Sequence, residues 1–394
     1  MRFLRGHRAL PVILLCVLLL IPGCWSGHEL TDQLIVLGIG LDKVGDKVRL
    51  TVQGIRPEAS ISTASSPTGS GGSDQPPFSL LSADGDSVQE ALQKITRRVP
   101  RFIYGGHNQV FFIGESLARE GIMPYLDLFA RSQWSQESAW VVIARDGTGQ
   151  QLLTTTNLVA KYPSMGLAQT VRAHQVHIPT LFQFLLHYHD NSSCQILVSA
   201  AAAKNKTAPS GYQMEQLRLQ PNAIFQGDKL VGYLNSSDCE AYAWLEYGFQ
   251  GTSFSFPVST VNGAPALGVS LTGAPAQFRV FSTPELGVRV EVDCNFSVTE
   301  DIPSPLNSPA AIRELESKLD QVLSQRFSLL FAHLQEDKTD VFNLAEKVHA
   351  YHLALWEKDK DRWPELYAKL PVEITVNSHF RHSGVMTKYP GFKE

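Results

Sequence analysis

The sequence predicts an α+β protein of several domains, each a mixed or antiparallel β-sheet flanked by helices. The first half alternates short β-branched runs with amphipathic segments of helical period, which is typical of a mixed sheet covered by helices. The second half opens with a hairpin pattern and closes with two amphipathic helices and an alternating strand. With 43% apolar and 18% charged residues, the 394-residue chain can form two or three hydrophobic cores.

The charge balance argues against nucleic acid as a partner. The chain carries 38 acidic and 34 basic residues, a formal net charge of −4. Phosphate binding needs clustered Lys and Arg on one face, and no long basic run occurs. We therefore expect no nucleic-acid interface.

Residues 1–23 have the pattern of a secretory signal peptide. Arg2, Arg5 and Arg8 precede an uncharged apolar run over residues 9–21. In a helix this run rises about 20 Å, less than the ~30 Å hydrocarbon core of a bilayer. Because the leader holds three of the 34 basic residues and none of the 38 acidic ones, its removal leaves a net charge of −7.

The end of the leader predicts a lipid attachment site. Ile21-Pro22-Gly23-Cys24 resembles a bacterial lipobox, in which the cysteine sulfur receives diacylglycerol before cleavage. We therefore predict that Cys24 becomes an N-acylated S-diacylglycerol cysteine, whose acyl chains anchor the mature protein to a membrane. The simpler alternative is that Cys24 is the first cysteine of a secreted protein.

The other cysteines suggest structural thiols. Cys16 leaves with the leader, so Cys194, Cys239 and Cys294 remain beside Cys24. Three cysteines form at most one disulfide, and no CxxC pair indicates a metal or redox site. We expect most of them to be buried free thiols.

Residues 24–205 are predicted to form an N-terminal α/β region of two subdomains. Residues 33–55 read as two strands joined by a turn at 42–46, and the Ser-, Gly- and Pro-rich stretch 59–77 reads as a mobile loop. Ser87 and Glu90 form a capping-box pattern ahead of a helix. We further expect strands at 108–113, 139–144 and 195–201, and helices at 115–131, from 149, and at 178–188.

Residues 212–394 are predicted to form a C-terminal α+β domain. It should open with a hairpin of 218–225 and 230–234, followed by a short helix capped by Ser237 with Glu240. Several strands are expected between 253 and 299, with a hairpin turn at 284–287. The remaining predicted elements are a long helix capped by Ser308 with Pro309 at its first position, a second helix capped by Asp340, and a strand in which Val372, Ile374 and Val376 point inward.

Several segments resemble the lipoprotein (C) subunits of bacterial spore germinant receptors. The mature start over residues 24–32 is similar to that family's opening, although Ser26-Gly27-His28 replaces an acid and two basic residues. Further similar stretches follow in the family's order, at residues 38–43, 101–113, 139–145, 223–232, 339–342, 363, 370–372 and 381–384.

The resemblance implies a function in spore germination. It implies a lipid-anchored, non-catalytic subunit on the outer face of the spore inner membrane, working with two integral membrane subunits in sensing nutrient germinants. A solute-binding lipoprotein of a transporter is the alternative, and it would need two similar lobes around a cleft. An envelope enzyme is a third possibility.

We predict no catalytic, cofactor-binding or metal-binding residues. Gly38-Ile39-Gly40 lacks a third glycine, since Lys43 stands in its place, and a hairpin explains it better than a dinucleotide site. Ser164 in YPSMG lacks the first glycine of a nucleophile elbow. Four histidines form an HxxH and an HxH pair but have no nearby cysteine, and no acid beyond Asp190. We therefore expect scattered surface or helix-packing histidines rather than metal ligands: His174, His177, His187 and His189.

Overall fold

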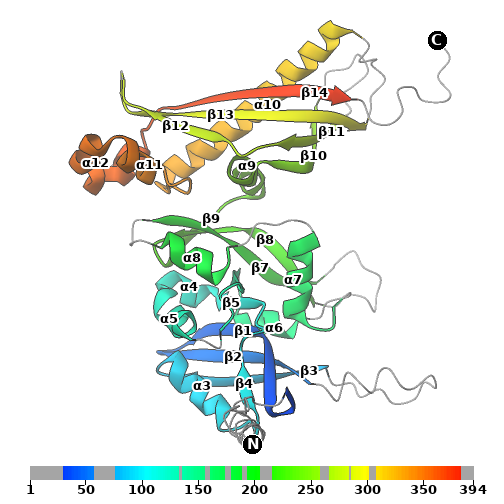
Figure 1. Ribbon diagram of the computed structural model, residues 1–394, viewed down its shortest axis with the longest axis vertical. Coiled ribbons are helices and arrows are strands. Elements are labelled where there is room, and N and C mark those ends of the chain that lie inside the picture. Colours follow the sequence, from blue (N-terminus) through cyan, green and yellow to red (C-terminus); the bar gives the residue numbers. More distant parts are fainter. Residues whose placement is uncertain are drawn as a thin grey trace, which may run out of the picture.

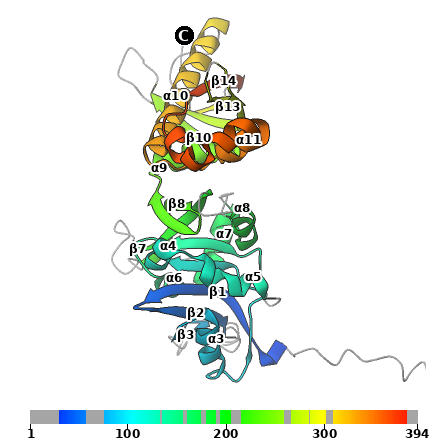
Figure 2. The same cartoon turned by 90° about the vertical axis from the view of Figure 1, so that its left-hand side faces the viewer.

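The structure is a computed structural model, and its strands form two sheets in two bodies. It describes residues 30–56, 76–132, 135–155, 160–173, 179–188, 193–204, 215–257, 266–283, 285–300 and 308–382. Figures 1 and 2 show the bodies stacked along the long axis, with β8 and β9 at the junction. Both sheets carry helices, so the predicted α+β class is confirmed.

The first body contains a mixed sheet. Its strands pair in the order β3-β2-β1-β5-β6-β7-β8-β9, and β4 joins the start of β1. The strands β1, β5, β6 and β7 run parallel, whereas β2, β3, β8 and β9 pair antiparallel to their neighbours. Their bounds are β1 Gln33–Val44, β2 Lys47–Ile55, β3 Phe78–Gly85, β4 Phe102–Tyr104, β5 Val110–Gly114, β6 Trp140–Ala144, β7 Cys194–Lys204, β8 Glu215–Gln226 and β9 Lys229–Tyr233. We expected two subdomains between residues 24 and 205, whereas the strands of this region form one continuous sheet.

Both faces of this sheet are buried, which explains the near-continuous apolar character of β5 and β6. On β5, Phe111 and Ile113 enter one core, while Val110 and Phe112 enter the core on the opposite face. The helices of the first core are α3 Val88–Thr96, α4 Glu115–Glu120, α5 Met123–Arg131 and α8 Leu181–His187. The helices of the second core are α6 Gly149–Thr154 and α7 Pro163–Ala173.

The single helix predicted over 115–131 is wrong, because the chain breaks between α4 and α5. Gly121 has φ +128°, which a residue with a side chain rarely adopts, and Pro124 lies in the first turn of α5. Half of the capping box predicted for α3 is confirmed, since Ser87 Oγ accepts from the amide of Glu90. The Glu90 carboxylate, however, accepts from the amide of Asp86 at 2.7 Å rather than from Ser87.

Glycines on β1 let α6 approach the sheet closely. A Cβ at Gly40 would lie 3.0 Å from the carbonyl carbon of Gly149, and a Cβ at Gly149 would lie 2.3 Å from the carbonyl oxygen of Phe112. The Gly38-Ile39-Gly40 pattern therefore serves helix-to-sheet packing inside a strand of the predicted hairpin.

The second body contains a five-stranded sheet. Four strands pair in the order β10-β11-β13-β12. The fifth strand, β14, pairs parallel with β13. The strands are β10 Phe249–Pro257, β11 Ala266–Gly273, β12 Gln277–Phe281, β13 Gly287–Glu300 and β14 Val372–His382. Its helices are α9 Ser236–Tyr247, α10 Pro309–Glu336, α11 Leu344–Tyr351, α12 Leu353–Asp359, the 3-10 turn η2 Lys360–Arg362, and α13 Trp363–Tyr367.

Most local signals of the second half are confirmed. Ser308 Oγ accepts from the amide of Ala311 at the start of α10, and β14 alternates inward and outward residues from Val372 to Val376. The predicted cap of α9 is wrong, because Asn235 occupies that position and accepts from the amide of Asp238 at 2.9 Å. The helix therefore begins at Ser236, before the predicted Ser237 cap.

The hairpin of β8 and β9 joins the first sheet, although we expected it to open the C-terminal domain. The long strand β7 offers its free edge to β8, which pairs with it antiparallel from Cys194–Gln226 to Lys204–Glu215. One face of this hairpin region also belongs to the core of the second body, since Cys194, Ile196 and Ile224 pack there with α9 residues. The two bodies therefore share a hydrophobic core.

Most of the predicted loop at 59–77 lies outside the described residues. The backbone amide of Arg56 donates to the carbonyl of Pro77 at 3.0 Å, which brings the two ends of this segment together. The ends then continue as the antiparallel pair β2 and β3.

Candidate functional site

A cleft with two cavities lies where the two bodies meet. The cavities have volumes of about 510 and 790 Å³, and both are lined by Cys194 of β7 and Asn343 of the segment before α11. Clefts of this size at domain junctions are common binding sites. We take this junction cleft, defined by the two cavities, as the candidate functional site.

The smaller cavity has aromatic and polar walls from both bodies. The first body contributes Trp140 at the start of β6, Arg172 of α7 and His187 of α8. The Arg172 guanidinium lies 5.2 Å from the centre of the Trp140 ring and donates to Gln109 Oε1 at 2.9 Å. The second body contributes Tyr242, Glu246, Tyr247, Gln250, Val341 and Asn343.

Glu246 is the acidic group of this cavity. Its side chain is accessible to solvent, yet the surrounding walls remove water and raise its pKa above 4.5. The charges of Lys347 and His187 oppose that shift. Beside it, the rings of Tyr242 and Tyr247 lie perpendicular with centres 6.1 Å apart. The cavity therefore offers one carboxylate among aromatic surfaces.

Asp340 organises the larger cavity. Its carboxylate accepts from the amides of Leu344 at 2.9 Å and Ala345 at 2.8 Å, and from Trp363 Nε1 at 3.1 Å. Burial raises the pKa of Asp340, and these three donors oppose the rise. The predicted cap is wrong in position, because Asn343 and not Asp340 is the N-cap residue of α11. Asp340 nevertheless binds the first two amides of that helix and holds α13 against it.

Cys194 at the junction of the cavities is an unreactive thiol. Burial raises its pKa to about 12, and the charge of Asp340 contributes to the rise. In the described part of the chain, Cys194, Cys239 and Cys294 are thiols and not disulfides, in agreement with the expectation of structural thiols.

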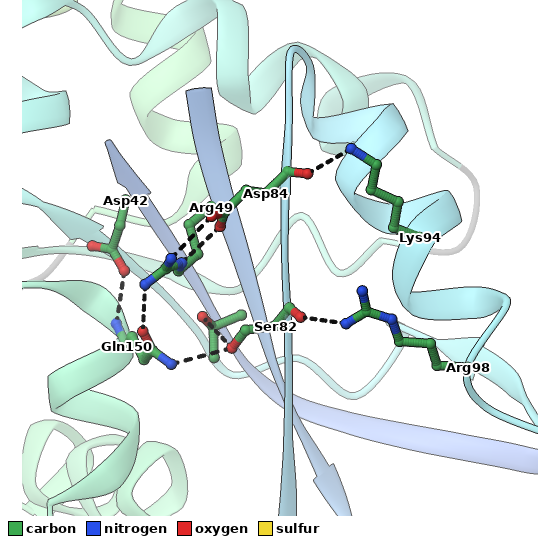
Figure 3. A network of polar contacts seen from close by, with 8 residues as sticks. Asp42, Arg49, Ser82, Asp84, Lys94, Arg98 and Gln150 are labelled. Atoms are coloured by element: carbon green, nitrogen blue, oxygen red, sulfur yellow. Dashed lines mark hydrogen bonds and ion pairs between the residues drawn. The ribbon is translucent and has the colours of Figure 1, made fainter. Parts of the chain in front are cut away.

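A second polar cluster in the first body is structural (Figure 3). Arg49 of β2 donates to both oxygens of Asp84 on β3, at 2.7 and 2.9 Å. Asp42 of β1 accepts from the amides of Gly149 and Gln150, at 2.6 and 2.9 Å, and thereby binds the start of α6. These bonds join β1, β2, β3 and α6, and they explain why charged side chains occur inside the predicted hairpin.

The predicted site residue Cys24 lies outside the described residues, as do His174, His177 and His189. His187 ends α8 with Nδ1 2.8 Å from the carbonyl of Gln183, and it faces the smaller cavity. Ser164 is buried at the start of α7, where its hydroxyl bonds to Gln53 Oε1. Within the part of the chain that the structure describes, no three His, Cys, Asp or Glu residues gather as metal ligands would. In that part, also, no helix has the length and hydropathy needed to cross a bilayer.

The cleft residues were not predicted from sequence as a group. They come from β6, α7, α8, β7, α9 and the segment before α11, and they share no local spacing. The sole sequence signal was the capping role of Asp340. The arrangement can bind a small amphipathic molecule or a segment of a partner.

Comparison with known proteins gives consistent matches along nearly the whole chain. Residues 26–200 match a family model described as the spore germination protein N-terminal domain, and residues 222–384 match one described as spore germination B3/GerAC-like, C-terminal. Spore germination protein KC of Bacillus subtilis is 25% identical, covering 95% of this chain and 96% of the relative. The putative spore germination protein YfkR of the same organism is 22% identical with the same coverage. The crystal structure of the GerBC protein superposes with a TM-score of 0.53 at 17% identity, over 87% of this chain and 96% of that one, which supports the fold.

Proposed function

The chain belongs to the GerAC-like family of spore germination proteins, and we propose that it is the lipid-anchored, non-catalytic C subunit of a nutrient germinant receptor. In this role acylated Cys24 holds it on the outer face of the spore inner membrane, where it assembles with two integral membrane subunits. The observation that carries the proposal is the ordered match of both family models, which begins directly behind a lipobox.

The junction cleft supports a role in binding. Its walls combine the aromatic rings of Trp140 and Tyr242 with the charged groups of Arg172 and Glu246, drawn from both bodies. Aromatic and Arg side chains are frequent at protein interfaces. A partner segment seated there would contact both bodies at once.

Gene deletion tests the role in germination. Spores that lack the gene should respond less to at least one nutrient germinant, and the wild-type gene supplied in trans should restore the response. Unchanged germination across a panel of germinants, in a strain without a redundant receptor, would contradict the proposal.

Replacement of the lipidated cysteine tests the anchor. Cys24→Ala should abolish incorporation of labelled fatty acid and release the protein from the membrane fraction. Cys16→Ala is the matched control, because Cys16 lies within the leader and should leave labelling intact. Lipid incorporation that survives Cys24→Ala would refute the assignment.

The cavities also give a specific reason to test the alternative of a solute-binding lipoprotein. The two sheets that flank the cleft differ in strand order and number, unlike the similar lobes which that class needs. Calorimetry of the mature chain with candidate solutes separates the two. Tight binding of one solute by this chain alone would favour the transporter role.

A further inference from the structure

A basic and aromatic patch lies at the end of the first body where β1 begins. The residues Arg97, Arg98, Arg101 and Phe102 follow one another at the end of α3 and the start of β4, and we call them the α3–β4 patch. Figure 1 shows α3 and β4 at the end of the first body that is far from the second body, and β4 pairs there with the start of β1.

The patch is exposed and carries an unbalanced positive charge. Arg97 and Arg98 are exposed, Arg101 is partly exposed, and Phe102 is 55% exposed. The chain contains no acidic residue from Ala91 to Gly114. Among the described ion pairs, none includes these three arginines.

Helix capping accounts for only part of the patch. Positive charges favour the C-terminal end of a helix, and Arg97 is the C-cap of α3. Arg98 donates to the carbonyl of Ser82 at 3.3 Å. Arg101 and Phe102 lie beyond this last turn, so the helix dipole does not explain a further arginine beside an exposed aromatic ring.

The position of the patch relative to Cys24 indicates what it faces. Phe102 pairs with Gln33 at the start of β1, and a chain from Cys24 to Gln33 spans at most about 30 Å when fully extended. If Cys24 is acylated, the patch is therefore kept close to the bilayer surface, whereas the second body lies at the other end of the long axis.

We propose that the α3–β4 patch binds anionic phospholipid headgroups, so that the first body contacts the membrane through Arg97, Arg98, Arg101 and the Phe102 ring. The inference rests on the proposed lipid anchor and adds an orientation to it. The net charge of −7 on the mature chain does not oppose this contact, because charges more than about 10 Å from the surface are largely screened at 0.1 M salt. Basic residues at the surface supply the attraction, and an aromatic ring beside them suits the headgroup boundary.

Vesicle binding of the mature chain carrying Cys24→Ala tests the patch without the lipid anchor. Sedimentation compares vesicles of phosphatidylcholine alone with vesicles of equal parts phosphatidylcholine and phosphatidylglycerol. The chain should partition more strongly into the anionic vesicles, and the preference should fall as salt rises. The combined variant Arg97→Gln, Arg98→Gln and Arg101→Gln should lower that partition on the order of 100-fold, since each surface arginine contributes about five-fold.

A matched control removes the same charge elsewhere. Lys358→Gln, Lys360→Gln and Arg362→Gln neutralise three exposed basic residues of the second body, and should leave the partition within about two-fold. Equal partition of the patch variant and its parent, an equal loss in the control variant, or binding that ignores lipid charge would each overturn the proposal. The single variant Arg101→Gln, expected to lose about five-fold, guards against misfolding of the triple variant.

The anchor is scored separately with the acylated chain. Acylated protein should sediment with both kinds of vesicle whether or not the patch arginines are present. If it sediments with neither, the anchor proposal fails. If it sediments with both while the Cys24→Ala chain shows no preference for anionic lipid, the patch proposal alone fails.

Discussion

Asp340→Ala should destabilise the second body by about 3 kcal/mol. The substitution removes a carboxylate that accepts from the amides of Leu344 and Ala345 and from the indole of Trp363. Leu344 and Trp363 are buried, and each buried donor left without an acceptor costs about 1–3 kcal/mol. These two donors give a gross loss of about 4 kcal/mol, which is partly offset because the variant no longer buries a carboxylate.

Urea unfolding followed by tryptophan fluorescence measures this loss, because Trp363 reports on the helices that Asp340 joins. The variant should unfold at lower urea with an unchanged slope. Asp337→Ala is the matched control, since Asp337 is an exposed acid at the end of α10 and should change stability by less than about 0.5 kcal/mol. A loss below about 1 kcal/mol for Asp340→Ala would refute the view that its three hydrogen bonds hold α11 and α13 together.

Three further predictions concern the first body and the cleft. Gly149→Ala should lower stability in thermal unfolding by about 1–3 kcal/mol, because its Cβ would lie 2.3 Å from a carbonyl oxygen of β5. Gly232→Ala, whose Cβ would meet its nearest neighbour at 4.0 Å, should be close to neutral. Equal losses in the two variants would contradict the packing argument. The hydrogen bonds from Arg49 hold the pKa of Asp84 below 3.8, so their contribution to stability is present above that pH and is lost as pH falls through the pKa of the folded state. Arg49→Met should reduce the loss of stability at acid pH by at most about 1 kcal/mol, since Asp84 is 34% exposed. Urea unfolding measured across acid pH with the same pH dependence in variant and parent would count against it. Because the pKa of Cys194 is about 12, its alkylation at pH 8 should be about a thousand-fold slower in the folded chain than in urea, and mass spectrometry showing the rate of an ordinary thiol would disprove its burial.

Local patterns in the sequence predicted individual elements well. The hairpin of β1 and β2, the Ser308 cap of α10 and the alternation in β14 all depend on contacts within a few residues or on a simple period. The break between α4 and α5 was missed because the apolar period continues through Gly121, and the positive φ there depends on the surrounding fold. Asp228 shows this dependence directly, since its carbonyl accepts from the amide of Ile122 across 106 positions of sequence.

The candidate site could not be predicted in the same way. Trp140, His187, Tyr242 and Glu246 line one cavity only because the shared core packs α9 against β7 and β8 of the first sheet. None of them has a spacing that differs from ordinary surface or core residues. The opposite holds for Cys24, because the prediction that it is acylated rests only on the adjoining leader and lipobox residues and not on the fold.

The pairing of β7 with β8 has a consequence for how members of the family can be recombined. The two family models are separated by residues 201–221. A chimera joined there would take β7 from one parent and most of the β8–β9 hairpin, which pairs with β7, from the other. Cys194 and Ile196 would then meet a foreign α9, so the graft would mismatch both a strand register and a core. A crossover placed after Tyr233 keeps the sheet of one parent intact and leaves a single packing surface to be matched. The segment that must come from one parent to keep the first sheet intact therefore extends through β9.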